Sequence, residues 1–279
     1  MKLSCYKLEL CSIALLTVAF AVIAGLFEVG VFARKIPVSE RVLKIVEEVR
    51  PYSASPSGLA AGEGILWLSY PAEKLILGLN QSSGEVVREL RIREVVPVEL
   101  AYGHGVLWVA DALKGRVVGL DPSDGRVLKS LCEELVYPTA ITFHHGYLYV
   151  YEALTEELLR VDLDGRLVAT VKVPRIRGLA ASEEGLWLLV PDNVTILLLS
   201  WDGLKPLRTY YVPTPAPRGL AWDGRYLWLG DYESFDVLKL DPHAKLWKLV
   251  DTKAPPWLLP LYLILVAPFL LSLLSKRRH

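Results

Sequence analysis

Residues 219–242 read GLAWDGRYLWLGDYESFDVLKLDP, and this stretch decides the fold that the sequence predicts. An apolar run at Gly219–Trp222 is followed by the tight turn Asp223-Gly224 and a second apolar run at Tyr226–Gly230. After a polar loop comes an alternating run at Phe235–Leu240. Short apolar runs cut by Gly, Asp and Pro are typical of β-hairpins in series. The stretch therefore predicts three consecutive short strands.

The same pattern occurs four more times upstream. An aromatic residue of the second strand recurs in the five copies at Trp67, Trp108, Tyr149, Trp187 and Trp228. The residue that opens each copy keeps the same register, at Leu59, Leu100, Ile141, Leu179 and Leu220. Four-stranded propeller blades repeat at about 40 to 45 residues, close to this spacing. The two columns predict an all-β, five-bladed β-propeller, with a six-bladed ring as the alternative.

Each copy supplies four candidate strands, named a to d from the axis of the ring outward. Strand b is apolar nearly throughout, as in Ile65-Leu-Trp-Leu68, which is typical of a strand buried on both faces. Strands c and d are joined by turns such as Asp121–Gly125, in which Gly can take a positive φ. The fifth copy has Asp241-Pro-His-Ala244 instead, without Gly. Its last hairpin should therefore be looser, with Lys245–Val250 as its outermost strand.

A segment upstream of the first copy is expected to close the ring. Arg41–Arg50, RVLKIVEEVR, resembles Arg126–Leu135, RVLKSLCEEL, which is a d strand followed by its exit. The upstream segment is therefore predicted to be a d-type strand that pairs with the fifth copy, since circular closure removes exposed sheet edges. Closure by strands from both chain ends would also place the two terminal segments side by side.

Both ends of the chain are long and apolar. Leu10–Phe27 carries no charge, and the apolar run continues with one interruption to Ala33. Ala254–Ser275 is also uncharged, with Trp257 near one edge and Lys276–Arg278 beyond the other. An aromatic residue at one interface and a basic cluster past the other are typical of a membrane-spanning helix whose C-terminus lies inside.

These segments divide the chain into three predicted parts. They are an N-terminal transmembrane anchor or signal peptide at residues 1–35, a propeller at 36–253, and a C-terminal transmembrane helix with a basic cytoplasmic tail at 254–279. If both ends span the membrane, the propeller lies outside the cytoplasm. Arg34 and Lys35 then flank the first segment on the outer side, where the positive-inside rule disfavours them. Cleavage after Ala33 would remove that conflict, so anchor and signal peptide both stay open.

Composition excludes one class of partner. The chain has 31 basic and 31 acidic side chains, and no basic face is visible outside short terminal runs, so nucleic acid is not expected. Of Cys5, Cys11 and Cys132, only the last belongs to the predicted propeller, and no disulfide can form within that part. The scarcity of Asn, Gln and Met beside many charged side chains suggests a source that grows hot.

Both places where Asn occurs are acceptor sequences for N-glycosylation. They are Asn80-Gln-Ser82 and Asn193-Val-Thr195. Turn chemistry alone would also explain either Asn. Glycosylation at Asn80 and Asn193 is therefore an expectation, and the intact mass of the native protein would test it.

The motif WVAD-x5-V-x2-LDP-x2-G at Trp108–Gly125 resembles the repeat of the YVTN/NHL-like propeller superfamily. The resemblance covers roughly Leu59–Val250. In outline the chain is similar to virginiamycin B lyase and to the five-bladed glutaminyl cyclotransferases. The Phe-Thr-Gln-Gly-Leu motif expected of the cyclotransferases is absent, and Ser57-Gly58-Leu59 occupies the corresponding position. The resemblance thus implies a fold and no particular activity, because members of one fold differ in function.

Two histidines fall in one repeat column, at the turn between strands a and b. The equivalent positions are Glu63, His104, His145, Glu183 and Gly224. With His144 as a neighbour they could be metal ligands, but a metal needs three or four ligands that converge on one point. Because these positions belong to separate blades, the column is interpreted as solvent-facing turns. No metal and no cofactor is predicted.

The d–a and b–c loops emerge together on the opposite face and are longer. Asp111, Glu152 and Asp231 follow strand b, while Arg177 and Arg218 precede strand a. Longer loops on a rigid scaffold are where binding residues collect, and a guanidinium can hold a carboxylate with two parallel hydrogen bonds. These five residues are therefore predicted to bind an anionic ligand. The competing interpretation is that the acids only cap their own loops.

No catalytic residue is predicted. The sequence has no Ser-His-Asp order, Gly-rich phosphate loop, paired-cysteine motif or HExxH. The expected function is that of a non-catalytic, membrane-anchored binding or scaffold module outside the cytoplasm, for a protein, a glycan or a small anionic ligand. An extracytoplasmic lyase or hydrolase of the propeller type is the alternative.

Overall fold

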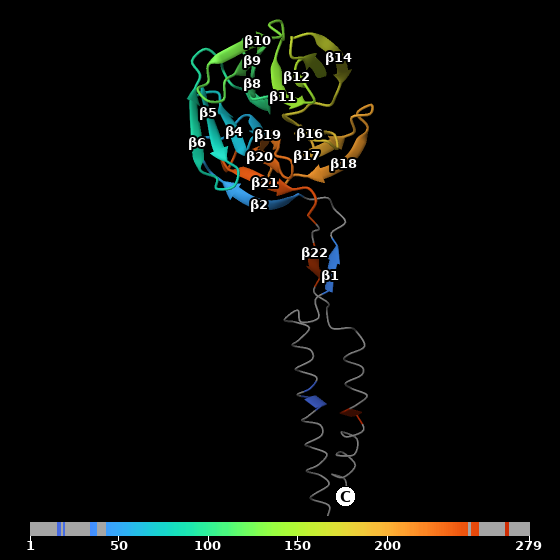
Figure 1. Ribbon diagram of the computed structural model, residues 1–279. Coiled ribbons are helices and arrows are strands. Elements are labelled where there is room, and N and C mark those ends of the chain that lie inside the picture. The colour runs from blue at the N-terminus through green and yellow to red at the C-terminus, as the bar shows by residue number, and fades with distance from the viewer. Residues whose placement is uncertain are drawn as a thin grey trace, which may run out of the picture. The chain divides into compact units, whose positions relative to one another are not determined.

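The computed structural model describes residues 43–244, the strands Arg34–Pro37 and Trp247–Val250, and single positions at 16, 17, 19, 266 and 267. The chain divides into two compact units, Met1–Ser39 with Lys245–His279 and, separately, Glu40–Ala244. The second unit holds five four-stranded antiparallel sheets around a common axis (Figure 1). The sheets are referred to as blades 1 to 5 in chain order.

Each blade runs from an inner strand a to an outer strand d. Blade 1 consists of β3 (Leu59–Gly62), β4 (Ile65–Tyr70), β5 (Leu75–Asn80) and β6 (Val86–Arg91). Blade 2 consists of β7 (Glu99–Gly103), β8 (Val106–Asp111), β9 (Arg116–Leu120) and β10 (Val127–Leu131). Blade 3 consists of β11 (Pro138–His144), β12 (Tyr147–Glu152), β13 (Glu157–Asp162) and β14 (Leu167–Lys172). Blade 4 consists of β15 (Gly178–Ala181), β16 (Leu186–Val190), β17 (Thr195–Leu199) and β18 (Pro206–Tyr211).

Blade 5 is completed by a strand from the start of the chain. It contains β19 (Pro217–Trp222), β20 (Leu227–Asp231), β21 (Val237–Asp241) and, outermost, β2 (Lys44–Val49). The inner strands contact one another in the order β3, β7, β11, β15 and β19, and β19 contacts β3. The ring is therefore closed with five blades, as predicted, and the six-bladed alternative does not apply.

The predicted closing strand is confirmed, but the strand order of the fifth copy was predicted wrongly. β2 pairs antiparallel with β21, from Lys44 opposite Asp241 to Val49 opposite Val237. The segment expected to be the fourth strand forms β22 (Trp247–Val250), which pairs with β1 (Arg34–Pro37) in a separate sheet. Turn chemistry explains the difference, because the c–d turns of the other copies use a Gly at positive φ. Those residues are Gly84, Gly125, Gly165 and Gly203. The fifth copy has no Gly there to turn the chain back.

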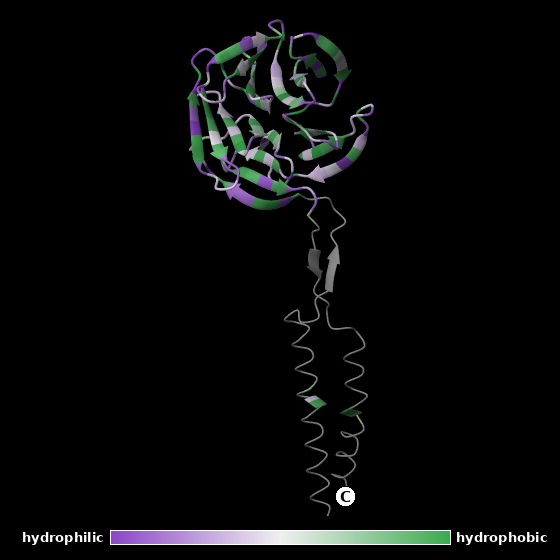
Figure 2. Cartoon of the chain, in the orientation of Figure 1, coloured by the Kyte–Doolittle hydropathy of each residue, from purple (hydrophilic) through white to green (hydrophobic). Residues whose placement is uncertain are grey.

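The hydrophobic core is divided into five clusters, one at each interface between neighbouring blades. The aromatic column of the b strands lies in these clusters, and its four tryptophans are at most 2% exposed. A blade packed on both sides must be apolar on both faces, which explains the composition of strand b. The outermost strands β2 and β6 carry the hydrophilic segments seen in Figure 2, because one of their faces meets solvent.

The first unit is described in its two-stranded sheet. β1 and β22 are antiparallel, with Arg34 opposite Val250 and Pro37 opposite Trp247. The chain therefore leaves this ladder toward residue 33 and toward residue 251 at the same end. Among the described residues no helix is long and apolar enough to cross a membrane. The two predicted transmembrane helices lie almost entirely outside the described residues, and they stay predictions.

Candidate functional site

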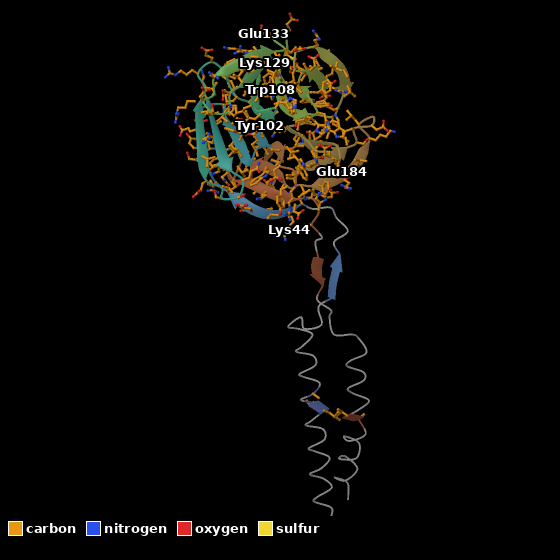
Figure 3. All side chains as sticks on the ribbon, in the orientation of Figure 1. Lys44, Tyr102, Trp108, Lys129, Glu133 and Glu184 are labelled. Carbon is orange, nitrogen blue, oxygen red and sulfur yellow. The ribbon has the colours of Figure 1, made fainter. Side chains whose placement is uncertain are left out.

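A hollow of about 390 Å³ opens on the face that carries the a–b turns. Blades 3, 4 and 5 contribute to its wall, together with the segment that follows β21. The lining residues are His144, Ala181, Ser182, Glu183, Glu184, Trp187, Trp222, Gly224 and His243. This space is called the a–b hollow below. Glu184, labelled in Figure 3, comes from the a–b turn of blade 4.

A tight turn presents the two histidines of blade 3. β11 and β12 pair up to His144 opposite Tyr147, which leaves a two-residue loop of His145 and Gly146. Both loop residues have positive φ, 47° and 80°, as a type I′ hairpin turn requires. Histidine tolerates this left-handed conformation better than most residues that carry a side chain. The turn thus places two imidazoles side by side, with ring centroids 4.0 Å apart.

An indole from blade 4 holds the first of these rings. The imidazole of His144 stacks on Trp201, with centroids 4.4 Å apart and planes within 3° of parallel. The indole N–H of Trp201 donates to the carbonyl of Ser182 at 2.9 Å, so the indole is itself tied to the a–b turn of its blade. Burial, and then the neighbouring His145, lower the pKa of His144, which favours its neutral form.

The second histidine contacts the next blade. His145 Nε2 lies 3.2 Å from Glu183 Oε2, so two members of the turn column from separate blades meet. The ligand atoms of His144, His145 and Glu183 all lie within 4.8 Å of one another. Both side chains are exposed, as expected for solvent-facing turns of separate blades, but these two turns lie next to each other. The sequence aligns equivalent positions but does not show which of them touch. His104 packs instead edge-on against Phe143, 4.9 Å between centroids.

The opposite wall of the a–b hollow is aromatic. Trp222 stacks on Trp187 with centroids 5.7 Å apart, and His243 meets Trp222 edge-on at 6.4 Å. Trp187 is buried and donates its indole N–H to the hydroxyl of Ser182, whereas Trp222 is only half-buried. Glu184 pairs with Arg208 at 2.6 Å, so its charge is partly compensated. The wall therefore offers a partly exposed indole with polar groups around it.

The central channel leaves little space. It holds about 50 Å³ and is lined by small or apolar residues of the five inner strands. Tyr102, labelled in Figure 3, lies directly over Gly62 of blade 1, and Phe143 lies over Gly103 of blade 2, where any side chain would collide with these rings. Ala181 and Trp222 line both the channel and the a–b hollow. A ligand larger than a few waters therefore fits the hollow and not the channel.

On the opposite face, the three predicted acids are buried, and each one contacts groups of its own blade or of the loop beside it. Asp111 pairs with Arg116, Oδ2 to Nε at 3.3 Å. Glu152 Oε2 accepts the backbone N–H groups of Val136 and Tyr137. Asp231 accepts the N–H of Glu233 and the hydroxyl of Ser234, each at 3.0 Å. The contacts of Glu152 and Asp231 are those of the loop-capping interpretation, whereas Asp111 forms an ion pair with a side chain of the next strand.

The two predicted arginines are not paired with these acids. Arg177 is exposed, and the guanidinium of Arg218 lies 4.2 Å from the ring centroid of Tyr232. Within residues 43–244, no hydrogen bond or ion pair joins either side chain to Asp111, Glu152 or Asp231. Anion binding by this set stays a prediction. Asn80 and Asn193 are exposed, and the Asn80 side chain also accepts the N–H groups of Ser82 and Ser83, which is a turn role.

One buried acid had not been singled out from the sequence. Glu99 is 1% exposed, and its Oε1 accepts the N–H groups of Leu59 in blade 1 and Leu100 in blade 2. Burial raises the pKa of Glu99 well above its ordinary value, although the two hydrogen bonds oppose the shift. It is the one acid at the start of an inner strand, since the equivalent positions are Gly58, Ala140, Gly178 and Gly219. That departure from the column was visible in the sequence.

The Glu99→Gln variant is expected to be more stable than the wild type at about pH 7 and similar to it near pH 4. The unfolded chain ionises Glu99 once the pH exceeds the ordinary pKa, whereas the folded chain keeps the proton, so rising pH costs the wild type stability. An amide oxygen can accept the same two N–H groups, and Gln does not titrate. Melting temperatures of both proteins across this pH range test the prediction. A difference in melting temperature between the two proteins that stays the same at every pH would contradict the prediction.

No protein-family description and no curated protein matches this chain. The solved structure of Myxococcus xanthus glutaminyl cyclase matches the fold of this chain. The TM-score is 0.63 and the sequence identity 14%, and the match covers 77% of this chain and 100% of that chain. The chain is a five-bladed β-propeller. Its other structural matches include the β-propeller domain of Myceliophteria thermophila Cps50 (Swd1), with a TM-score of 0.50 and 10% identity over 71% and 99% of the two chains.

Virginiamycin B lyase from Staphylococcus aureus is also similar to this propeller, with a TM-score of 0.45 and 20% identity over 67% and 66% of the chains. The propeller resemblance expected from the repeat motif is confirmed by the fold and by the matches to glutaminyl cyclase and Cps50 (Swd1). At such identities the likeness is one of fold alone, because one fold carries many activities. The function of this propeller has to be argued from its own side chains.

Proposed function

We propose that this propeller is a binding module, tethered to the membrane outside the cytoplasm, that holds a glycan in the a–b hollow. One observation carries the proposal, namely a half-buried indole, Trp222, set among hydrogen-bonding side chains in a 390 Å³ space. Binding sites commonly combine apolar or aromatic walls with a few placed polar groups. The face of a sugar ring can pack on the indole while Glu183 and His243 bind its hydroxyl groups.

Charge favours a neutral ligand over an anion in this hollow. Its lining contains two carboxylates, Glu183 and Glu184, and no Arg or Lys. The lowered pKa of His144 keeps that imidazole uncharged near neutral pH. An anionic ligand would meet repulsion from Glu183, whereas hydroxyl groups can donate to it. A hydroxyl-rich neutral ligand therefore suits these side chains best.

The proposed location of the propeller outside the cytoplasm is argued from the two terminal segments of the chain. The β1–β22 ladder sends the chain toward both uncharged terminal segments from one end, which suits two helices that enter the same membrane side by side. The basic residues after Ser275 favour a cytoplasmic C-terminus, and the propeller then lies on the other side. Protease added to intact cells, once the wall is opened, is expected to digest the propeller. Protection under those conditions would reverse the orientation.

The ligand is tested with the purified full-length chain and a panel of neutral oligosaccharides, by thermal shift and then by calorimetric titration. A ligand that binds the folded state raises the melting temperature. Trp222→Leu and His243→Ala are each expected to weaken the best oligosaccharide about tenfold or more, by roughly 1.4 kcal/mol. Tyr232→Ala is the matched control, since it removes a 51% exposed aromatic residue from the opposite face.

Two results would contradict the glycan proposal. One is an unshifted melting temperature with every oligosaccharide. The other is a loss of binding in Tyr232→Ala or in an Arg177→Ala/Arg218→Ala variant, which would move the site to the opposite face and restore the anion prediction. The enzymatic alternative is supported only by the shared fold, and a shared fold does not carry an activity with it.

A further inference from the structure

We propose that His144, His145 and Glu183 form a zinc site at the rim of the a–b hollow. Two imidazoles and one carboxylate are a ligand set that Zn²⁺ accepts readily, with a fourth position left for water or a ligand. Ca²⁺ and Mg²⁺ prefer oxygen ligands and are disfavoured by two histidines. Among the described residues, this is the one group of three His, Cys, Asp or Glu side chains whose ligand atoms converge.

The geometry needs only small side-chain movements. Ligand atoms around tetrahedral zinc lie about 2.0 to 2.2 Å from the metal, and so about 3.4 Å from one another. The three groups are already within 4.8 Å. The side chains of His145 and Glu183 are 66% and 87% exposed, so both can rotate inward without displacing the core.

The third ligand is held in place. His144 stacks on Trp201, whose indole N–H donates to the backbone carbonyl of Ser182. The type I′ turn sets the direction of the adjacent His145. His144 is thus held in place, while the exposed side chains of His145 and Glu183 can move. A metal could therefore bind without a change in the backbone of the turn.

A bound ion would join blade 3 to blade 4. His144 and His145 come from the β11–β12 turn, and Glu183 comes from the β15–β16 turn. Glu184 is engaged by Arg208, and that pairing leaves the neighbouring Glu183 as the acid available to the metal. The zinc and glycan proposals share Glu183, which would be a metal ligand in one and a hydroxyl acceptor in the other, so zinc is tested without oligosaccharide.

The test uses the full-length chain, stripped with a chelator, and Zn²⁺ as the only probe. We expect binding of one Zn²⁺ with a raised melting temperature, and a visible absorption band typical of tetrahedral Co²⁺ when Co²⁺ replaces zinc. His145→Asn should weaken Zn²⁺ binding about 100-fold or more, a loss on the scale of removing a ligand. Asn suits the left-handed turn position, so this variant keeps the hairpin. His144→Phe should have a similar effect while it preserves the stack on Trp201.

His104→Asn is the matched control, since His104 occupies the equivalent turn position of blade 2 with φ 54° and has no second histidine beside it. Its zinc affinity is expected to equal that of the wild type. Failure of the wild type to bind Zn²⁺ at micromolar concentrations would overturn the proposal. So would equal losses in His104→Asn and His145→Asn, or unchanged affinity in both His144→Phe and His145→Asn.

Discussion

A chain that begins at residue 51, and so lacks β2, is expected to lose cooperative thermal unfolding. β2 supplies the outer strand of blade 5 and pairs along the whole length of β21. Without it, β21 becomes an open edge in a sheet of three strands, and exposed edges promote aggregation. Leu43, Ile45 and Val49 would also leave the clusters that join blade 5 to blades 4 and 1.

The apolar contacts dominate this effect. Leu43 is 2% exposed, and its replacement by Ala alone should cost about 2 to 5 kcal/mol. The ion pair of Arg50 with Asp236 at 2.8 Å is at the surface, where such pairs contribute little to stability. The loss of the strand therefore far exceeds the loss of its charges. Circular dichroism during heating measures the transition.

The control is a chain that begins at residue 40, which keeps β2 and omits the first apolar segment. It is expected to unfold cooperatively, within a few degrees of the full-length protein. If the chain from residue 51 also unfolded in one sharp transition near that temperature, β2 would not close the ring in solution.

Trp108→Ala is expected to lower the free energy of unfolding by about 3 to 5 kcal/mol, the usual cost of a large aromatic side chain removed from a core. Trp108 is 2% exposed and lies in the cluster between blades 2 and 3. Its ring also covers Gly119 on the neighbouring strand, where an added Cβ would lie 3.0 Å from the ring and push it by a few tenths of an ångström. Alanine would leave a cavity between two rigid blades that cannot collapse far. Equilibrium denaturation in guanidinium chloride measures the loss.

Two Trp→Phe variants separate packing from hydrogen bonding in this column. Within the described part of the chain, Trp108 Nε1 has no hydrogen-bond partner, whereas Trp228 Nε1 donates to Asp223 Oδ2 at 2.7 Å. Trp228→Phe should therefore cost more than Trp108→Phe, by about 1 to 3 kcal/mol, because a hydrogen bond to a charged acceptor is lost. Equal costs would show that Asp223 does not stabilise the indole.

The sequence predicts the ring well because each blade repeats the same local chemistry. The tryptophan and leucine columns follow from packing between blades, and every blade needs that packing. The order of strands in blade 5 could not be predicted in the same way. Lys44–Val49 and Trp247–Val250 are both plausible strands by pattern, and only the absence of a Gly turn after Asp241 distinguishes them. The missing Gly therefore decided which segment pairs with β21, although the repeat pattern predicted the other one.

The a–b hollow was missed for a related reason. Repeat columns identify equivalent positions, but a site between blades depends on which different positions meet, such as His145 and Glu183. Two departures from the repeat could have indicated it. Trp201 is a large aromatic residue in a polar c–d turn, and His144 stands where the first two copies have Gly62 and Gly103. Both break the pattern where the site lies.

During biosynthesis, the closing strand β2 is made long before the strand with which it pairs. β2 is among the first parts of the propeller to be made, and its partner β21 is among the last. Arg50, directly after β2, and its bonded Asp236 are 186 positions apart in the sequence. At about 5 to 20 residues per second, a ribosome needs roughly 10 to 40 s to span that interval. During this time β2 has no native partner, and contacts so distant in sequence form slowly. A nascent chain that stops before blade 5 therefore leaves β2 without the strand that it pairs with.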